Sequence, residues 1–192
     1  MHPTAARLAK RLQQRGLQIE VRRLSDSART AALAAAALDV EVGQIVKSLV
    51  FLRKGEPVMV LCAGDRRVDA ERLGLSPVTA DRVREVTGFS IGGIPPLGHD
   101  IELATTIDES LRRFDTVWAA AGTHHDVFAI SRHTIGSAVA GLKGHSIADA
   151  DAVLQRIIDA AAVRHLREGT AVITAEDVRS ALLALRGTAS SY

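Results

Sequence analysis

A lysine lies in the middle of an apolar stretch, VGQIVKSLVF, whose pattern is typical of a β-strand. An ammonium group is costly among valine, leucine and phenylalanine unless it has a task there. Lys47 could hold a phosphate, because its charge is compact and its stem can lie along an apolar wall. A lysine on an edge strand can also simply prevent aggregation, so both roles stay open.

A glycine- and proline-rich stretch, TGFSIGGIPPLGH at residues 87–99, is the second place where chemistry could occur. Its backbone carries few bulky side chains, so it could approach a ligand closely and turn N–H groups toward an oxyanion. If Gly93 contacts the reacting group, any Cβ at this position would obstruct the substrate. The alternative is a loop that only turns a corner in a sheet.

Two adjacent histidines follow a predicted strand in the stretch AAAGTHHDVF. Neighbouring side chains point in different directions, so we do not expect His124 and His125 to form a paired metal site. A loop at a sheet edge often carries function, and one of these rings could donate a hydrogen bond to a substrate. An exposed loop histidine without such a role is the alternative.

Other residues that could do chemistry are few. The lone cysteine, Cys62, lies in the apolar run PVMVLCAG and is interpreted as a buried small hydrophobe rather than a nucleophile. One cysteine cannot form an intramolecular disulfide, and no Cys/His spacing resembles a zinc site, so we expect neither a metal nor a cofactor. No Ser-His-Asp order stands out, which leaves covalent catalysis by the protein poorly supported.

Positive charge is concentrated in the first third of the chain. The net charge is +2, but residues 1–53 hold nine Lys/Arg against four Asp/Glu, net +5. Such a region could meet nucleic acid, although solvated surface arginines would give the same count. The cations concerned include Arg22, Arg23, Arg29, Lys47 and Arg53.

The sequence contains no apolar run near the roughly 20 residues that a membrane span requires. The first residues also lack the apolar core of a signal peptide. We therefore expect a cytoplasmic protein without a membrane partner.

The elements that would position these residues alternate between helix and strand. Spacing and caps predict helices over residues 4–16, 25–38 (capped by Asp26 or Ser27) and 79–88, with short helices over 68–74 and from Asp108. Apolar alternation predicts strands over residues 17–24, 101–107, 115–122 and 126–131, and a hairpin over 45–64.

This order of elements predicts a mixed α/β domain over residues 1–149, since a hairpin excludes a purely parallel sheet. Residues 150–192 instead predict two helices joined by a short turn, a C-terminal helical hairpin. Their apolar stripes need cover, so we expect the hairpin to pack on the α/β body or to form a homodimer.

Taken in order, GQIVKSLVF, TGFSIGGIPPLGH and TVWAAAGT resemble the YbaK/EbsC family of bacterial aminoacyl-tRNA deacylases, relatives of the editing domain inserted in prolyl-tRNA synthetases. The resemblance covers roughly residues 1–149 and joins three motifs. It implies a mixed α/β fold with a strongly twisted, barrel-like sheet surrounded by helices.

The resemblance also implies hydrolysis of the ester between a wrong amino acid and the 3′ end of a tRNA. The partners would be the acceptor end of aminoacyl-tRNA and, as a second candidate, prolyl-tRNA synthetase. In this family the strand lysine holds the phosphate or terminal adenosine, while a substrate group or a water attacks the ester. The expected catalytic residues are Lys47 and Gly93. The expected substrate-binding residues are Ser48, Gly92, Pro95, Gly98, His99, Gly122, Thr123 and His124.

Substrate choice is less sharply indicated. Members that act on cysteinyl-tRNA tend to have Ser-Gly-Gly where this chain has Ala120, Ala121 and Gly122, whereas Gly122, Thr123 and His124 resemble the Gly-x-His of the alanine-directed branch. A different class of function, a non-catalytic module that binds a tRNA end or a nucleotide, is the alternative. The intact GGIPPLG loop favours the enzyme.

Overall fold

A computed structural model of the chain describes residues 1–25 and 29–139. The predicted helical hairpin over 150–192 and the predicted domain boundary at residue 149 lie outside these described residues. None of the helices in the described part is long and apolar enough to cross a membrane.

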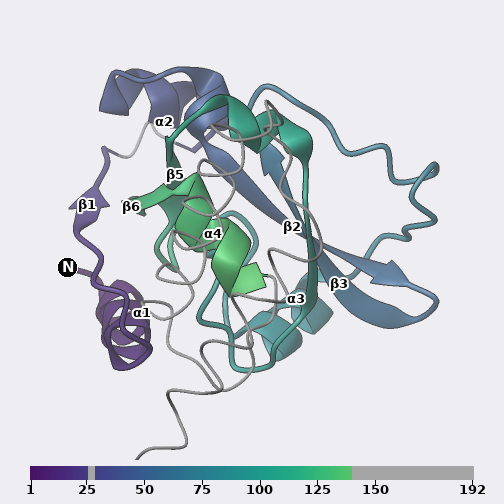
Figure 1. Cartoon of the computed structure of the whole chain (residues 1–192). Helices are drawn as coiled ribbons and strands as arrows, with labels where there is room; N and C mark the ends of the chain where they lie inside the picture. Colours follow the sequence, from purple (N-terminus) through teal and green to yellow (C-terminus); the bar gives the residue numbers. More distant parts are fainter. Residues whose placement is uncertain (26–28, 140–192) are drawn as a thin grey trace, which may run out of the picture.

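The described chain forms a mixed α/β body with two three-stranded sheets (Figure 1). One sheet has the order β1-β6-β5 and is antiparallel throughout. The other has the order β2-β3-β4, in which β2 and β3 are antiparallel and β4 joins β3 in parallel. The strands are β1 (Val21–Arg23), β2 (Val46–Arg53), β3 (Glu56–Ala63), β4 (Ala104–Ile107), β5 (Thr116–Ala120) and β6 (Asp126–Ser131).

The expected single barrel-like sheet is therefore replaced by two smaller sheets that do not close into a barrel. They touch through a parallel bridge between Ile45, just before β2, and Trp118 in β5. Beyond this bridge, apolar side chains from both sheets and from the loop after α3 (Ala80–Thr87) share one core, which includes Val50, Ile94 and Val117. Since one isolated bridge joins the sheets within the described residues, they associate mainly through these side chains and not through a continuous ladder of hydrogen bonds.

Within the described residues, four α-helices surround the sheets, and local sequence explains where the first three begin or end. The N-terminal helix buries Leu8 and Leu12 on one face and is followed by Gly16, whose φ is 83°. Thr30 caps the second helix, while the expected caps Asp26 and Ser27 lie outside the described residues. The helices are α1 (Pro3–Gln14), α2 (Ala31–Leu38), α3 (Ala80–Thr87) and α4 (Arg132–Val139), with 3-10 turns η1 (Val42–Gln44) and η2 (Glu109–Arg113).

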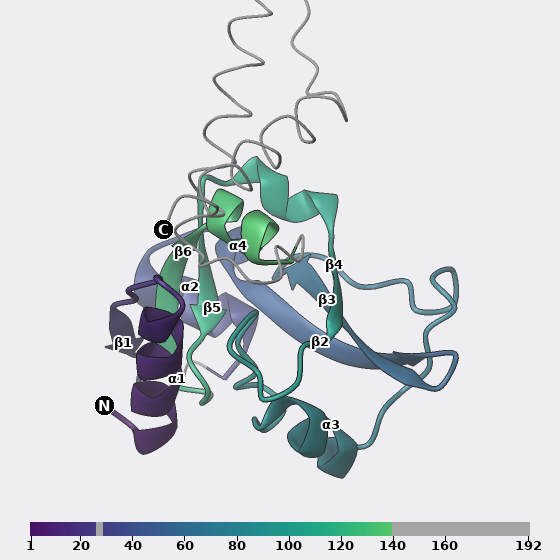
Figure 2. The ribbon, with the colours of Figure 1, turned by 60° about the horizontal axis from the view of Figure 1, so that its bottom comes forward.

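The prediction for α3 is confirmed at both ends. The side chain of Thr79 accepts a hydrogen bond from the N–H of Arg82, and Gly88 ends the helix with φ of 78°. The glycine-rich loop begins at that glycine. Figure 2 shows the connection from α3 to β4 running between β5 and the β2–β3 hairpin.

Two local predictions need correction. Residues 68–74 form no helix, and 70–74 are turns, because one short segment with Leu73 exposed has too few contacts to offset the cost of nucleation. The strand expected over 17–24 is reduced to β1. The short helix expected from Asp108 is confirmed as the 3-10 helix η2, which Asp108 caps. Helix α4 was not predicted; it follows β6 directly and buries Ile135.

The β2–β3 hairpin is confirmed, with eight paired positions from Val46–Ala63 to Arg53–Glu56. Its residues alternate between two faces. Val46 and Val50 join the main core, whereas Phe51 packs against a smaller cluster on the other face. Cys62 is 1% exposed, as expected for a small hydrophobe in a core strand.

Candidate functional site

Two loops that are about 30 residues apart in sequence meet backbone to backbone. A Cβ added to Gly93 would lie 2.8 Å from Cα of Thr123 and 2.9 Å from the carbonyl carbon and oxygen of Gly122. A Cβ added to Gly92 would lie 2.3 Å from Nδ1 of His124. The structure thus brings together Gly92, Gly93, Gly122, Thr123 and His124 from the predicted site.

Gly122 has a specific reason to be glycine. Its φ is 94°, and a Cβ there would lie 2.9 Å from the methyl group of Thr4 and 3.1 Å from the ring of Phe89. The chain turns sharply at this point, directly after β5 and Ala121. The two glycine-lined loops therefore leave no space for side chains where they meet.

His99 lies inside the glycine-rich loop. Its ring is 8% exposed, and its Nε2 donates a hydrogen bond of 2.7 Å to the carbonyl of Pro95. The ring also meets Phe89 edge to face, with centroids 6.1 Å apart. Burial lowers the pKa of His99 below its ordinary value, although the hydrogen bond to Pro95 opposes this effect. The neutral ring of His99 thus links two parts of the same loop through its hydrogen bond to Pro95.

Helix α1 fastens the same loop from outside. Arg11 donates a hydrogen bond of 2.6 Å to the carbonyl of Gly98 and another of 2.6 Å to Asp100. Arg7 reaches the carbonyl of Gly88 at 3.4 Å. Leu8 lies under Gly98, where an added Cβ would come within 2.6 Å of its side chain. Both ends of the loop are thus held by one helix.

Lys47 is half-buried on β2, an edge strand of its sheet, directly opposite Cys62 on β3. Its ammonium donates a hydrogen bond to the carbonyl of Arg66, in the turn after β3. The isolated Ile45–Trp118 bridge brings the start of β2 next to β5, two residues before Lys47. No hydrogen bond or ion pair within residues 1–25 and 29–139 joins Lys47 to the glycine-rich loop.

Ser48 belongs to the other face of β2, toward the main core. It is paired with Leu61 of β3. Its hydroxyl oxygen is buried and has no hydrogen-bond partner within the described part of the chain. The alternation of the strand therefore separates Ser48 from Lys47, although the two residues are adjacent in sequence.

Two ionisable groups at the end of β3, Cys62 and Asp65, have shifted pKa values. Arg113 donates two hydrogen bonds of 2.8 and 2.9 Å to Asp65, and this contact holds the pKa of Asp65 below its ordinary value. Burial raises the pKa of the Cys62 thiol, and the nearby charge of Lys47 only partly offsets this. A thiol with a raised pKa is a poor nucleophile, which agrees with the structural role predicted for Cys62.

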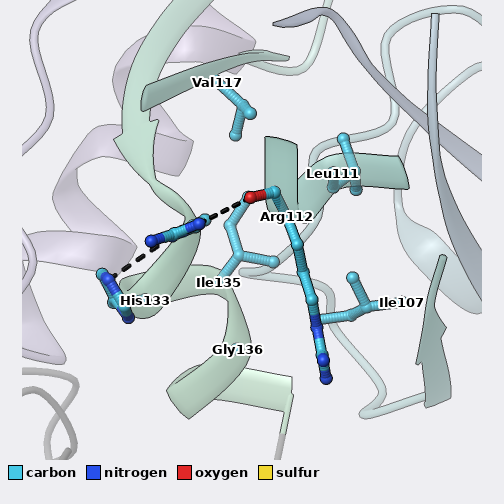
Figure 3. A pocket seen from close by; sticks show the side chains of 8 residues that line it. Ile107, Leu111, Arg112, Val117, His133, Ile135 and Gly136 are labelled. Atoms are coloured by element: carbon cyan, nitrogen blue, oxygen red, sulfur yellow. Dashed lines mark hydrogen bonds between the residues drawn. The ribbon is translucent and has the colours of Figure 1, made fainter. Parts of the chain in front are cut away.

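A cavity of about 290 Å³ lies where β4, η2, β5 and α4 meet. Figure 3 shows His133 and Ile135 on one side of it and Leu111 and Ile107 on the other. Sequence reasoning missed this cavity because α4 was not predicted, and it contains none of the predicted site residues. Its lining comprises Ile107, Leu111, Arg112, Val117, Arg132, His133, Ile135 and Gly136.

No group of three or more His, Cys, Asp or Glu side chains that could hold a metal ion occurs among residues 1–25 and 29–139. The adjacent rings of His124 and His125 lie 6.4 Å apart, at an angle of 64°.

The described residues define a class of fold, a small mixed α/β domain in which two glycine-containing loops meet and an edge strand carries a half-buried lysine. Residues 25–135 match the family model described as the aminoacyl-tRNA editing domain, and the chain belongs to this family.

Relatives agree with this assignment. The chain is similar to a candidate trans-editing enzyme for prolyl-tRNA synthetase whose crystal structure is known. The two sequences are 39% identical, and the structures match with a TM-score of 0.68 over 74% of this chain and 95% of that one. The uncharacterised protein YwhH of Bacillus subtilis (strain 168) is 32% identical over 58% of this chain and 76% of its own length. Proline--tRNA ligase of Lactobacillus acidophilus is 28% identical, over 44% of this chain but only 16% of the ligase.

Proposed function

We propose that this protein hydrolyses the ester of mischarged aminoacyl-tRNA as a separate, trans-acting editing enzyme. The observation that carries the proposal is the backbone contact between the loops at Gly92–Gly93 and Gly122–His124, in a chain of the editing-domain family. Such a contact creates a rigid surface with few side chains, against which an ester can be held. The similarity to a candidate trans-editing enzyme over 95% of that chain supports the trans-acting part.

The proposed chemistry needs no nucleophile from the protein. Water attacks the ester carbonyl directly, or a group of the substrate attacks first and water completes the hydrolysis. Attack by the ribose 2′-hydroxyl would give the 2′ ester, and attack by a side-chain thiol would release a thiolactone and leave the ribose hydroxyl. With water, the bond from the carbonyl carbon to the ribose oxygen breaks, that oxygen takes up a proton, and the free amino acid leaves. The protein contributes orientation, with N–H groups near Gly92 and Gly122 facing the developing oxyanion. The N–H of Gly93 already donates a hydrogen bond of 3.0 Å to the carbonyl of Ser90, so Gly93 contributes close backbone packing rather than a donor.

Lys47 is the proposed anchor for the phosphate or terminal adenosine of the tRNA. Among the described residues its ammonium binds a backbone carbonyl, that of Arg66, so a phosphate could displace this contact. The start of β2 is bridged to β5, the strand that leads into the second loop. In this proposal the cation holds the nucleic acid while the loops hold the ester. Pro95, Gly98 and His99 are buried and would shape the glycine-rich loop behind the substrate. Ser48 faces the core from the other side of β2 and would support the strand that carries Lys47.

The proposed substrate is tRNA for proline carrying a wrong small amino acid. The residues at Ala120, Ala121 and Gly122 differ from the Ser-Gly-Gly of cysteine-directed relatives, so we favour alanine. A pocket that distinguishes side chains by one methylene gains only about 1–3 kcal/mol, so small changes in its wall would alter this choice. Prolyl-tRNA synthetase is a proposed partner, homodimerisation a proposed assembly, and the cytoplasm the expected location.

Incubation of the purified protein with a panel of mischarged tRNAs tests the function. The panel should contain alanyl- and cysteinyl-tRNA for proline, and correctly charged prolyl-tRNA as the control. We expect release of amino acid from at least one mischarged species and little release from prolyl-tRNA. Retained tRNA binding without release from any species would instead indicate a non-catalytic module.

A further inference from the structure

We propose that Asp126 is a positioning residue that, through the hydroxyl of Thr123, sets the loop at 122–124 against the glycine-rich loop. This inference rests on the proposed function and concerns the same site. It adds a residue that lies outside the three sequence motifs and touches neither Gly92 nor Gly93 in the contacts described above.

Asp126 is a fully buried carboxylate, with 0% exposure, at the first position of β6. A buried carboxylate is costly unless it is paired and hydrogen-bonded. Arg23 lies directly opposite on β1, and its Nη1 is 3.3 Å from both carboxylate oxygens of Asp126. Arg23 was one of the cations expected to meet a polyanion, but this ion pair gives it a partner within the protein.

The second partner of the carboxylate is Thr123. Its hydroxyl donates a hydrogen bond to Asp126 and accepts two more, from the N–H of His125 at 3.2 Å and from that of Asp126 at 3.0 Å. One donor and two acceptor positions are the full capacity of a hydroxyl. The Thr123 side chain is therefore fixed in one rotamer.

Backbone hydrogen bonds close the loop around this contact. The N–H of Ala121 donates to the carbonyl of Asp126 at 2.7 Å, and that of Leu24 to the carbonyl of His125 at 2.7 Å. The loop is thus tied to both neighbouring strands. The conformation of the loop therefore depends on the carboxylate of Asp126, whose burial would be unfavourable without these partners.

Three groups of the loop lie against the glycine-rich loop. The carbonyl of Gly122 and Cα of Thr123 contact Gly93, and the ring of His124 contacts Gly92. Rotation of the loop about Asp126 would separate these contacts without removing any residue that meets the substrate. Because a misplacement of about 1 Å can cost about 100-fold in rate, such a shift would appear in kcat.

The test compares Asp126→Asn and Thr123→Val with Thr123→Ser, which keeps the hydroxyl, and with Asp115→Asn. Asp115 forms an ion pair of 3.1 Å with Arg132 and lies just before β5, at the opposite end from the loop, so it is a matched control. Steady-state deacylation gives kcat and KM on the mischarged tRNA that the wild type cleaves, and thermal unfolding reports whether each variant is folded.

We expect Asp126→Asn and Thr123→Val to lower kcat by about 10- to 100-fold in the folded protein, with little change in KM. Thr123→Ser should recover most of the activity, and Asp115→Asn should retain it. The proposal is overturned if folded Asp126→Asn keeps the wild-type kcat, or if activity falls only in proportion to the folded fraction.

Hydrogen–deuterium exchange gives a readout that does not need activity. In Asp126→Asn we expect faster exchange in peptides covering residues 121–126 and also 90–94, with the β2–β3 hairpin unchanged. Faster exchange confined to 121–126 would show that the loops are not coupled and would overturn the proposal. Inactivity of the wild type on every tRNA would contradict the proposed function, whereas this exchange result would still decide the role of Asp126.

Discussion

Lys47 and Ser48 are adjacent in sequence but lie on opposite faces of β2, so they have different surroundings. Lys47 lies on the same face as Cys62 and is itself only half-buried, whereas Ser48 lies on the face of Leu61 and its hydroxyl oxygen is buried. The ammonium can therefore remain hydrated while its stem covers apolar surface. At the scale of single residues, function depends on which face of β2 a side chain occupies.

Lys47→Ala should abolish most of the deacylation while leaving the protein folded. Hydrogen bonds to charged groups contribute about 1.5–3 kcal/mol, so the loss of a phosphate contact should lower kcat/KM by about 10- to 100-fold. The thermal midpoint should change little, because a partly exposed lysine adds little to stability. Lys54→Gln, in the turn of the same hairpin, is the control for loss of one positive charge. Full activity of Lys47→Ala would remove the central role of this lysine.

His99 predicts how stability depends on pH. Because burial lowers its pKa in the folded protein, the unfolded chain, with a pKa of about 6.5, binds more protons below that pH. Stability from neutral His99 is therefore complete above about pH 6.5 and is lost as pH falls toward the lower folded value. The slope can reach about 1.4 kcal/mol per pH unit.

Urea unfolding at several pH values between 7.5 and 5 measures this effect. His99→Gln keeps an N–H donor for the Pro95 carbonyl but does not titrate, so the free energy of unfolding should fall less steeply with acid. His133→Gln, at an exposed position on α4, should leave the slope as in the wild type. Equal slopes for His99→Gln and the wild type would show that His99 does not carry the effect.

At the scale of elements, the contact between the two loops limits what can replace Gly93. The sequence suggested that a Cβ there would obstruct the substrate, but the structure gives Gly93 a neighbour from the protein itself, the backbone of Gly122 and Thr123. Gly93→Ala must move one loop, so we expect lower activity together with a stability loss of about 1–3 kcal/mol.

Gly136→Ala is the matched control for this substitution. A Cβ at Gly136 meets nothing within 4 Å, and the residue lies in α4, where alanine is favoured over glycine by about 1 kcal/mol. Urea unfolding and deacylation assays should therefore separate the two variants. If Gly93→Ala is as stable as the wild type and only inactive, the substrate is the obstacle that matters.

Helix α1 and the glycine-rich loop form a second pair of elements, joined by Arg11. Arg11→Ala removes hydrogen bonds to both Gly98 and Asp100, so it should lower the free energy of unfolding by about 1–2 kcal/mol. Asp100→Ala should cost less, because its side chain is 49% exposed and solvent weakens the ion pair. A double-mutant cycle by urea unfolding should give a coupling of about 0.5–1 kcal/mol. Additive effects would show that Arg11 acts only through Gly98.

At the scale of the whole molecule, the family match at residues 25–135 and the proposed site all precede residue 140. We therefore predict that a chain ending at residue 149 keeps deacylase activity wherever it is soluble. Loss of residues 150–192 should lower solubility or change the mass measured by light scattering, since the sequence predicts apolar stripes there that need cover from the α/β body or from a second subunit. A truncated protein of unchanged mass that no longer binds tRNA would assign this segment to the nucleic acid instead.

Local patterns in the sequence determined much of the body. The cap at Thr79, the stop at Gly88, the β2–β3 hairpin and the burial of Cys62 all followed from short-range spacing. Such features depend on neighbours within a few residues, so periodicity and capping residues are enough to predict them. The three motifs that indicated an editing domain were also visible without coordinates.

Only the tertiary structure decided which distant residues meet. The contact of Gly93 with Gly122, the pairing of Arg23 with Asp126 and the division into two sheets depend on how elements pack, and no local spacing encodes them. Asp126 looked like the polar start of a strand, and Arg23 like a surface cation. A charge costs little in water but much in a protein core. Burial of the Asp126 carboxylate therefore required a partner, and Arg23 lies opposite it.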